Sequence, residues 1–560
     1  MKLKLKIIFL GIIFLSLPLF TYAAETFNID PSYDWKGREE IQASLHQIGK
    51  KAYFYVEDIY YQQLNFSEKS LFEDSLKNLS SEFDGRIYPV LTTKFGSEWK
   101  PGIDKDEKIT ILIHPMQKEA GGYFNNADQY PRAQVPTSNE REMVYLNANF
   151  ITDPLAKSLL SHEFTHLITF NQKNRKYGVE EDIWLNEGRA EYAPTLIGYN
   201  TPYSESILKK RVDAFLANPS DSLTEWKNQK TDYGVLNLFI QYLVDYYGVK
   251  ILVDSLHSEK TGIESINYVL KKNNFEEDFS QIFTNWTITV LVNNCSLAPK
   301  YCYLNENLKN FRIAPQTNFL PFAVKATLTR RDSTKDWSGN WYKIIGGKGE
   351  LEIEFSSEAK INFKIPYLLG NFNGDSSINF LVLDSEGKGE IYIPNFGKNY
   401  TSLTLIPSVQ GKISDFTSEE RTFEFSWTAS IAEETEAEII ERLLEQIAFL
   451  KTEITKIQAQ IDAILARKAG QISCQEFEEN LFYGLRNDNR VRCLQEFLKS
   501  QGSEIYPESL VTGNFLSLTQ QAVIRFQEKY ASEILAPLGL EKGTGYVGPA
   551  TRAKINQLLK

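Results

Sequence analysis

The 560-residue chain is poor in histidine and cysteine, with five and four residues, and it has no excess of positive charge. Its 61 Lys and Arg residues are outnumbered by 72 Asp and Glu residues, which gives a net charge of −11 and a pI of about 5.3. Nucleic-acid-binding domains need the opposite balance to contact a phosphate backbone. The composition therefore argues against a nucleic-acid partner.

The four cysteines fall into two close pairs, Cys295 with Cys302 and Cys474 with Cys493. Neither pair has the spacing of a zinc-binding cysteine motif or a nearby histidine, which argues against a zinc site built on cysteine. In an exported chain, an even number of cysteines in local pairs predicts two disulfides. Free buried thiols are the alternative.

Beyond the N-terminus the chain lacks any apolar run that is long enough to span a membrane. At the N-terminus, three lysines within the first six residues precede an apolar run over 7–20, and small residues follow at Ala23 and Ala24. This pattern predicts a signal peptide over 1–24, and therefore a secreted, extracellular protein. An uncleaved anchor is the alternative, although the run is short for a membrane span.

Two of the few histidines lie four residues apart, in the segment Ser161-His162-Glu163-Phe164-Thr165-His166. This is an H-E-x-x-H motif inside a helical apolar pattern. Positions four apart share one face of a helix, so both imidazoles can point at one ion while Glu163 reaches a water beside it. Zinc accepts nitrogen and oxygen ligands in a tetrahedron, and a catalytic zinc keeps one position open. The motif therefore predicts one catalytic zinc ion.

A third protein ligand is needed, and Glu187 is the candidate in the downstream segment Trp184-Leu185-Asn186-Glu187-Gly188-Arg189-Ala190-Glu191. Glu191 falls on the same helix face and could accept a hydrogen bond from the far nitrogen of a ligand histidine. The second motif argues against the alternative reading, a helix with two surface histidines and no metal.

H-E-F-T-H followed by N-E-G-R-A-E-Y resembles the gluzincin metallopeptidases, the group of thermolysin and the aminopeptidase-N-like enzymes. The flanking Gly121-Gly122-Tyr123-Phe124 and Glu142-Met143-Val144-Tyr145-Leu146-Asn147 are most similar to the hyicolysin-type secreted members. The resemblance covers roughly residues 50 to 300 and implies a zincin-like fold. It implies that zinc is bound by His162, His166 and Glu187, that Glu163 is the general base, and that Glu191 supports a ligand.

The same resemblance implies a donor for the oxyanion of the tetrahedral intermediate. Tyr233 is the candidate and His257 the second choice, with a packing tyrosine as the alternative. It also implies that the strand 142–147 lines the cleft. Tyr145 and Asn147, with Tyr123 from the glycine-rich turn, are then candidate substrate contacts, unless 142–147 is an ordinary sheet strand.

A calcium site has little support in the sequence. Asp104 and Asp106 could bind calcium, but two carboxylates in one turn are more often solvated.

The chain is too long for a single core, and its patterns predict a multidomain α+β protein. Strand patterns at 52–56, 108–114 and 143–146 accompany a helical pattern at 67–83 in a catalytic domain over 25–310. Short alternating runs predict a β-sandwich domain over 311–430 in which we recognise no chemistry.

Residues 431–470 form a predicted helical linker with an apolar seam at three-then-four spacing. The helix could form a coiled-coil homodimer or fold back on another domain. The seam comprises Ile440, Leu443, Ile447, Leu450, Ile454, Ile457, Ile461 and Ile464.

The C-terminal domain, 471–560, carries a second resemblance, to the peptidoglycan-binding domain of cell-wall hydrolases. The matching elements are Val491–Leu498, Thr512-Gly513, Leu518–Gln527 and Gly545–Arg552. The resemblance implies a small bundle of three helices that binds peptidoglycan. Leu516 stands where glycine is usual and Ser532–Thr544 is an insertion, so a scaffold without ligand is the alternative.

Together these patterns predict a secreted, bacterial, cell-wall-associated zinc metallopeptidase. It would hydrolyse peptide bonds in proteins by metal-activated water, with Glu163 as general base. The absence of a G-x-M-E-N motif favours an endopeptidase. The alternatives are an inactive wall-bound binding or adhesion protein and a peptidase that cuts peptidoglycan cross-links.

Overall fold

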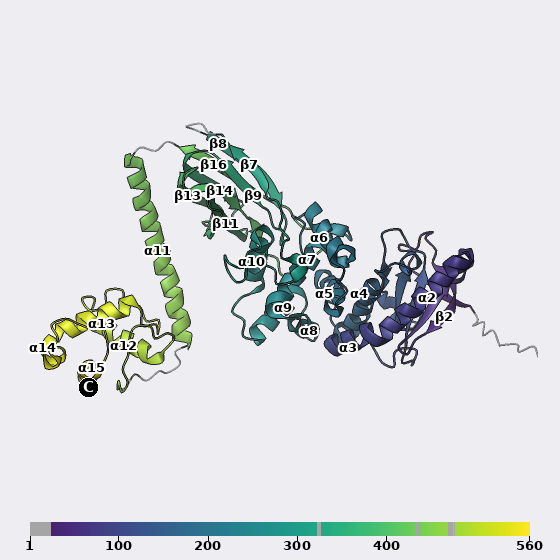
Figure 1. Cartoon of the computed structure of the whole chain (residues 1–560), viewed down its shortest axis with the longest axis horizontal. Coiled ribbons are helices and arrows are strands. Elements are labelled where there is room, and N and C mark those ends of the chain that lie inside the picture. Colours follow the sequence, from purple (N-terminus) through teal and green to yellow (C-terminus); the bar gives the residue numbers. More distant parts are fainter. Residues whose placement is uncertain (1–23, 322–325, 433–435, 469–473, 475) are drawn as a thin grey trace, which may run out of the picture. The chain divides into compact units, whose positions relative to one another are not determined.

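The computed structural model describes residues 24–321, 326–432, 436–468, 474 and 476–560 (Figure 1). It divides into two compact units, Met1–Glu433 and Glu434–Lys560. The predicted signal peptide lies outside the described residues except for Ala24. Among the helices that the structure describes, none combines the length and apolar character needed to cross a membrane.

The first unit begins with a six-stranded sheet in the order β1-β2-β3-β4-β6-β5. β3, β4 and β6 pair in parallel, and β4 and β6 are buried along their whole length, as expected of strands covered on both faces. β5 pairs antiparallel with β6 and ends the sheet. The strands are β1 Glu25–Asn28, β2 Glu40–Ile48, β3 Ala52–Glu57, β4 Ile109–His114, β5 Gly122–Tyr123 and β6 Met143–Asn147.

Helices cover one face of this sheet and continue into a helical region, while the other face has its own core of strand and loop residues. Asn65 begins α2 with a capping box, in which its side chain and that of Glu68 each accept from the other's backbone amide. The helices are α1 Asp58–Gln63, α2 Phe66–Glu82, α3 Tyr88–Phe95, α4 Ala156–Thr169, α5 Ile183–Ile197, α6 Ile207–Ala217, α7 Lys230–Tyr247, α8 Lys250–Leu256, α9 Gly262–Lys272 and α10 Phe279–Val292.

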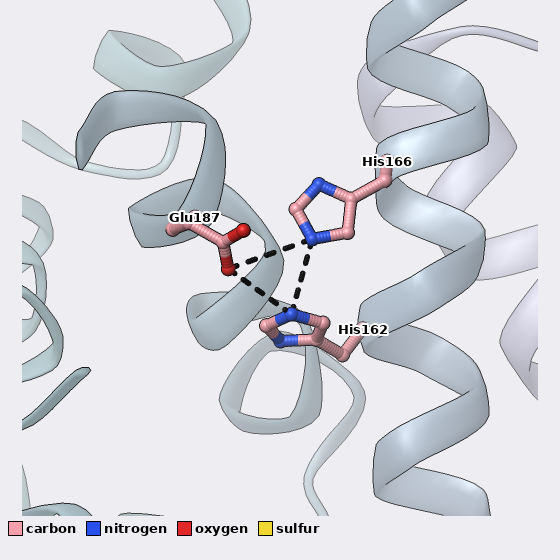
Figure 2. Close-up of side chains that lie close together, drawn as sticks. All are labelled: His162, His166 and Glu187. Atoms are coloured by element: carbon pink, nitrogen blue, oxygen red, sulfur yellow. Dashed lines mark hydrogen bonds and ion pairs between the residues drawn. The ribbon is translucent and has the colours of Figure 1, made fainter. Parts of the chain in front are cut away.

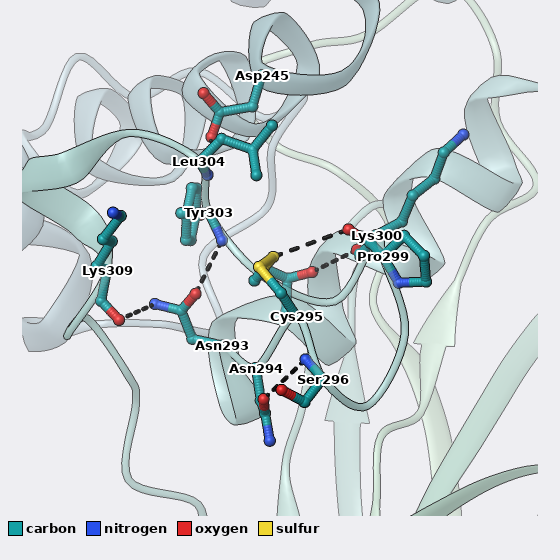
Figure 3. Close-up of a disulfide and its surroundings, with 12 residues drawn as sticks. Asp245, Asn293, Asn294, Cys295, Ser296, Pro299, Lys300, Tyr303, Leu304 and Lys309 are labelled. Carbon is teal, nitrogen blue, oxygen red and sulfur yellow. Dashed lines mark hydrogen bonds between the residues drawn. A yellow bond between two sulfur atoms is a disulfide. The ribbon is translucent and has the colours of Figure 1, made fainter.

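A loop closed by the predicted Cys295–Cys302 disulfide follows α10. Asn293 accepts from the Tyr303 amide at 2.8 Å and donates to the Lys309 carbonyl at 3.2 Å, beside the disulfide (Figure 3). The Tyr246 hydroxyl of α7 donates to the Cys302 carbonyl at 2.7 Å. The loop is therefore fastened to the helical region by both covalent and polar contacts.

The rest of the first unit is built from strands, as the alternating pattern predicts. One run of neighbours is β12-β11-β14-β9-β7 and another is β13-β10-β16-β8; the pair Phe396–Tyr400 connects β13 to β14. The strands are β7 Gln316–Leu320, β8 Ala326–Thr334, β9 Tyr342–Gly346, β10 Gly349–Ser357, β11 Phe363–Asn371, β12 Ser376–Leu381, β13 Lys388–Phe396, β14 Tyr400–Leu405, β15 Ser408–Val409 and β16 Phe423–Ala432.

This β-rich part has its own core around Trp427, but it also packs on α10. The Trp337 ring lies 4.9 Å from that of Phe279 and 5.4 Å from that of Phe283. The Trp341 indole donates to the Thr287 carbonyl at 2.9 Å. These buried indoles attach the strands to the helical region.

The second unit contains the long helix α11 and a small helical domain. The predicted Cys474–Cys493 disulfide is present. The insertion at 532–544 includes most of α14 and a short 3-10 helix over Ala536–Leu538. The helices are α11 Glu436–Lys468, α12 Asn489–Ser500, α13 Ser517–Lys529, α14 Ala531–Ile534 and α15 Pro549–Leu559.

The small domain repeats one arrangement, which we call the glutamine clamp. The buried Gln495 accepts from the amides of Thr512 and Gly513, both at 2.8 Å, and donates to the Thr519 hydroxyl at 2.8 Å. Gln527 makes the equivalent bonds at the same sequence offsets, to Thr544, Gly545 and Thr551. Both Thr-Gly turns place glycine at positive φ, which glycine adopts without steric cost.

Candidate metal centre

The two histidines of the H-E-x-x-H motif lie on consecutive turns of α4 and face Glu187 of α5 (Figure 2). The Nε2 atoms of His162 and His166 are 3.1 Å apart. Glu187 Oε2 lies 3.3 Å from the first and 3.6 Å from the second. Two imidazoles and one carboxylate therefore converge on one point, as the spacing predicts.

These three residues fit a metal ion. Each offers one ligand atom, and the three atoms lie within 4.8 Å of one another; no other such group occurs among the residues that the structure describes. Glu187 Oε2 is buried, and apart from the two imidazole nitrogens it has no polar partner among the described residues. A buried oxygen without a donor is costly unless a cation faces it, and zinc takes this nitrogen and oxygen set.

Glu191 contacts the His162 nitrogen that faces away from the proposed ion. Its Oε1 lies 3.3 Å from His162 Nδ1. Arg211 binds it through two nitrogens, at 2.6 and 2.8 Å, and the Asn237 amide donates at 3.1 Å. A carboxylate behind a ligand histidine fixes the ring's tautomer and direction.

Asn186 does the same for His166, and sequence reasoning overlooked it. Its Oδ1 lies 3.2 Å from His166 Nδ1. Its place directly before Glu187 on α5 is the signal that could have identified it. With Glu191 behind His162, both rings have a polar partner on the side away from the proposed ion.

The charges of the site are strongly coupled. Burial opposes the charged form of His162, but the carboxylates of Glu187 and Glu191 outweigh it and raise its pKa to about 10. Burial likewise works against ionised Glu187, yet the two imidazoles hold its pKa well below the usual range. A divalent cation would take the place of the shared protons, because metal binding and protonation compete for the same nitrogens.

Glu163 lies between α4 and the sheet edge, and burial raises its pKa. A Cβ at Gly122 of β5 would come within 2.9 Å of Glu163 Cγ and 2.5 Å of the Tyr145 carbonyl. Only glycine leaves space for the Glu163 side chain at this point. β5 is therefore the strand that borders the metal centre.

The structure brings Tyr233 to the site and leaves His257 away from it. The Tyr233 ring centroid lies 6.5 Å from that of His162, and its hydroxyl donates to Asn228 at 3.1 Å. The Arg211 guanidinium lies over the ring at 4.4 Å. His257 follows α8, where burial and the charges of Lys176 and Arg189 lower its pKa.

The three predicted substrate contacts are buried. Tyr123 is 4 % exposed, Tyr145 0 % and Asn147 1 %. The Tyr145 hydroxyl donates to Asp128 at 2.6 Å, and Asn147 donates to the Ala120 carbonyl at 2.7 Å. β6 is covered by β5, so the free edge is one strand further out than the pattern at 142–147 predicts.

The turn that could bind calcium is held by its own backbone. The Asp106 amide donates to Asp104 Oδ1 at 2.9 Å, and Lys108 donates to Asp106 at 3.0 Å. Neither aspartate belongs to a three-ligand group among the described residues.

The comparisons with known proteins agree with a metalloprotease family. The chain is 27% identical over 261 residues to Neutral metalloprotease ShpI of Staphylococcus hyicus. The match covers 42% of this chain and 55% of that protein, so the chain spans about half the length of the curated relative it matches. No protein-family model matches the chain.

Two solved structures each resemble about a fifth of the chain. The pre-peptidase C-terminal domain of a Bacillus anthracis collagenase is 11% identical, with a TM-score of 0.15; the match covers 20% of this chain and 96% of that one. PliG of Aeromonas hydrophila, a periplasmic inhibitor of g-type lysozyme, is 15% identical with a TM-score of 0.13, over 21% and 98%. TM-scores this low do not define a shared fold.

Proposed function

We propose that this protein is an exported zinc metallopeptidase that cleaves peptide bonds in proteins. The observation that carries the proposal is the convergence of His162, His166 and the buried Glu187 Oε2 beside the buried Glu163. The similarity to a neutral metalloprotease supports the same conclusion. The N-terminal sequence pattern supports export.

In the proposed mechanism, residues of the chain orient the metal ligands and transfer protons to and from the substrate. A bound zinc ion would lower the pKa of a water molecule and polarise the substrate carbonyl. Glu163 accepts the proton of the attacking water and returns it to the leaving amine. Tyr233 turns its hydroxyl from Asn228 and donates to the oxyanion. Asn186 and Glu191 keep the imidazoles aimed at the ion.

The test replaces Glu163 by Gln, which preserves size and hydrogen bonding but cannot accept the proton. We expect the Glu163→Gln variant to retain one zinc per chain and to lose roughly 10²- to 10⁴-fold in kcat/KM on casein-derived peptides. Metal content is measured by mass spectrometry of the purified protein, and cleavage by chromatography.

Glu180→Gln, at an exposed position between α4 and α5, is the matched control and should leave turnover unchanged. Full activity of Glu163→Gln would refute the mechanism. A wild-type protein that binds zinc but cleaves no peptide would favour the alternative, an inactive binding or adhesion protein.

We further propose that the second unit associates the enzyme with the cell wall. The clamped Thr-Gly turns and three main helices accompany the sequence resemblance to peptidoglycan-binding domains. Cosedimentation of Glu163→Gln with purified sacculi tests this association. Release of cross-link peptides from sacculi by the wild type, without casein cleavage, would instead support a peptidoglycan endopeptidase.

A further inference from the structure

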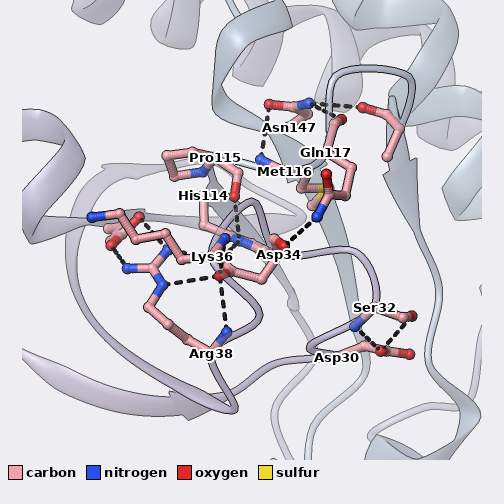
Figure 4. Close-up of polar contacts among 12 residues, drawn as sticks. Asp30, Ser32, Asp34, Lys36, Arg38, His114, Pro115, Met116, Gln117 and Asn147 are labelled. Atoms are coloured by element: carbon pink, nitrogen blue, oxygen red, sulfur yellow. Dashed lines mark hydrogen bonds and ion pairs between the residues drawn. The ribbon is translucent and has the colours of Figure 1, made fainter.

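The segment between β1 and β2, residues 29–39, is pinned to the sheet by the buried Asp34 (Figure 4). Arg38 binds Asp34 at 2.7 Å and also pairs with Glu57 at the end of β3. The Lys36 amide donates to Asp34 at 2.9 Å, and His114 lies 3.5 Å from it. These contacts fix the segment in one position at the carboxyl ends of β3 and β4.

The segment 29–39 places Tyr33 beside strand β5. Gln117 donates through its amide to the Tyr33 carbonyl at 2.8 Å and through its side chain to the Asp34 carbonyl at 2.9 Å. The Tyr33 ring stacks on that of Tyr123, with centroids 4.5 Å apart and planes 19° apart. The backbone and the ring of Tyr33 are therefore both held.

Tyr33 is the outermost member of a stack of three tyrosines. Tyr123 in turn stacks on Tyr145, with centroids 4.1 Å apart. The inner hydroxyls are occupied: Tyr145 donates to Asp128, and Tyr123 accepts from the Asp30 amide. Tyr33 is half-buried, and its hydroxyl has no hydrogen-bond partner among the described residues.

The Tyr33 ring lies beside β5, the strand that borders the metal centre. Tyr123 follows Gly122 on β5, and its side chain points to the opposite face of the sheet from Gly122 and Glu163, into the core against which Tyr33 packs. Burial, followed by the charges of Glu163 and Glu187, raises the pKa of Tyr33 to about 12. The phenol therefore remains a hydrogen-bond donor at neutral pH.

We propose that Tyr33 is a substrate-positioning residue, whose hydroxyl donates to a carbonyl oxygen of a peptide lying along β5. The inference rests on the proposed peptidase function and adds a contact from the segment before the second strand. The stack on Tyr123 sets the height of the Tyr33 ring above β5, and the Asp34 contacts hold the segment 29–39 in place. The bound peptide supplies the acceptor that the Tyr33 hydroxyl lacks.

The test compares Tyr33→Phe, which keeps the stacked ring, with the wild type on an extended peptide and on a truncated one. Loss of one hydrogen bond should lower kcat/KM on the extended peptide about 3- to 10-fold, mainly through KM. The truncated peptide, which lacks the residue contacted, should be cleaved as before. Zinc content should be unchanged, and Tyr33→Ala should lose more than Tyr33→Phe.

Tyr53→Phe is the matched control, because this β3 tyrosine bonds Asp106 away from the metal centre. Binding measured by calorimetry on a Glu163→Gln background separates the two proposals, since it needs no turnover. There, Tyr33→Phe should raise the Kd of the extended peptide about 3- to 10-fold. Equal affinity with and without the Tyr33 hydroxyl would overturn the inference, whether or not the wild type proves to be a peptidase.

Discussion

Glu191 shows how much a single buried residue can organise. Its carboxylate faces the His162 imidazole, the Arg211 guanidinium and the Asn237 amide, and the Arg211 charge, the imidazole and their hydrogen bonds overcome burial and lower its pKa to about 2. It therefore stays ionised at every pH at which the protein is expected to work. The ring it supports can present only the opposite nitrogen to an ion.

The buried Glu142 should make the stability of the protein depend on pH. Burial is the main cause that raises its pKa to about 7, with the Asp104 charge acting in the same direction. In the unfolded chain its pKa is about 4.3. Between these values the folded state holds more protons, so this residue's contribution to stability is greatest at low pH and falls as pH rises toward 7.

Glu142→Gln stays uncharged and should remove that dependence. We expect the Tm of the wild type to fall by a few degrees (~2–4 °C) more than that of the variant between pH 5 and pH 8, with the variant more stable at pH 8. Scanning calorimetry measures both. Glu107→Gln is the control, since its side chain is 73% exposed. A parallel pH profile for wild type and Glu142→Gln would contradict the buried-carboxyl explanation.

At the scale of elements, the metal centre depends on two helices and one short strand. α4 supplies both histidines and Glu163, α5 supplies Asn186, Glu187 and Glu191, and β5 closes the side next to Glu163. The helical period alone places each ligand on its face. The approach of α5 to α4 depends on the core that both helices share with the sheet and α7. Tyr123 of β5 packs instead in a separate core with Tyr145 and Leu112.

The glutamine clamps should stabilise the small domain of the second unit. Gln527→Ala leaves the buried Gly545 amide and the partly buried Thr544 amide without an acceptor, which should cost about 2–4 kcal/mol in that domain. Hydrogen exchange at these amides should accelerate by roughly 30- to 1000-fold.

The chain offers an internal reference for this experiment. All eight tryptophans lie in the first unit, so their fluorescence transition should not move. Gln557→Ala, at an exposed position on α15, serves as the matched variant. Unchanged exchange in Gln527→Ala would show that the clamp does not hold the turn.

At the scale of the whole molecule, α11 leaves an apolar seam uncovered within its unit. The residues Ile440, Ile447, Ile454 and Ile461 occupy one position of the heptad and are 39–64% exposed. The partner position holds Leu443 and Leu450 in the first half of the seam and Ile457 and Ile464 in the second half. Isoleucine with leucine favours a parallel two-stranded coiled coil, so the first half of the seam carries that preference. We therefore propose that α11 pairs with the same helix of a second copy.

Sedimentation equilibrium should give twice the mass of one chain for the wild type. Ile447→Glu combined with Ile454→Glu removes four isoleucines from the dimer seam and should weaken the association by more than ~10³-fold. Thr452→Glu combined with Thr455→Glu adds the same charge outside the seam and should remain dimeric. A monomeric wild type would favour a helix that packs against its own chain.

Several features could be read from sequence because they depend on neighbours along the chain. The H-E-x-x-H face, the long helix and both local disulfides follow from short-range spacing, and the structure contains each of them. Calcium at Asp104 gained no support, because the turn uses those carboxylates for its own amides.

Tertiary structure decided what surrounds the metal centre. Asn186 reaches His166, and Tyr33 reaches β5, through packing that no period encodes. Tyr145 and Asn147 are buried, and β5 rather than β6 forms the edge. The sequence by itself determined that His162 and His166 share one helix face, since residues four apart lie about one helical turn apart. Which strand borders the metal ligands, and which tyrosine lies beside that strand, depended on how distant segments pack on the two faces of the sheet.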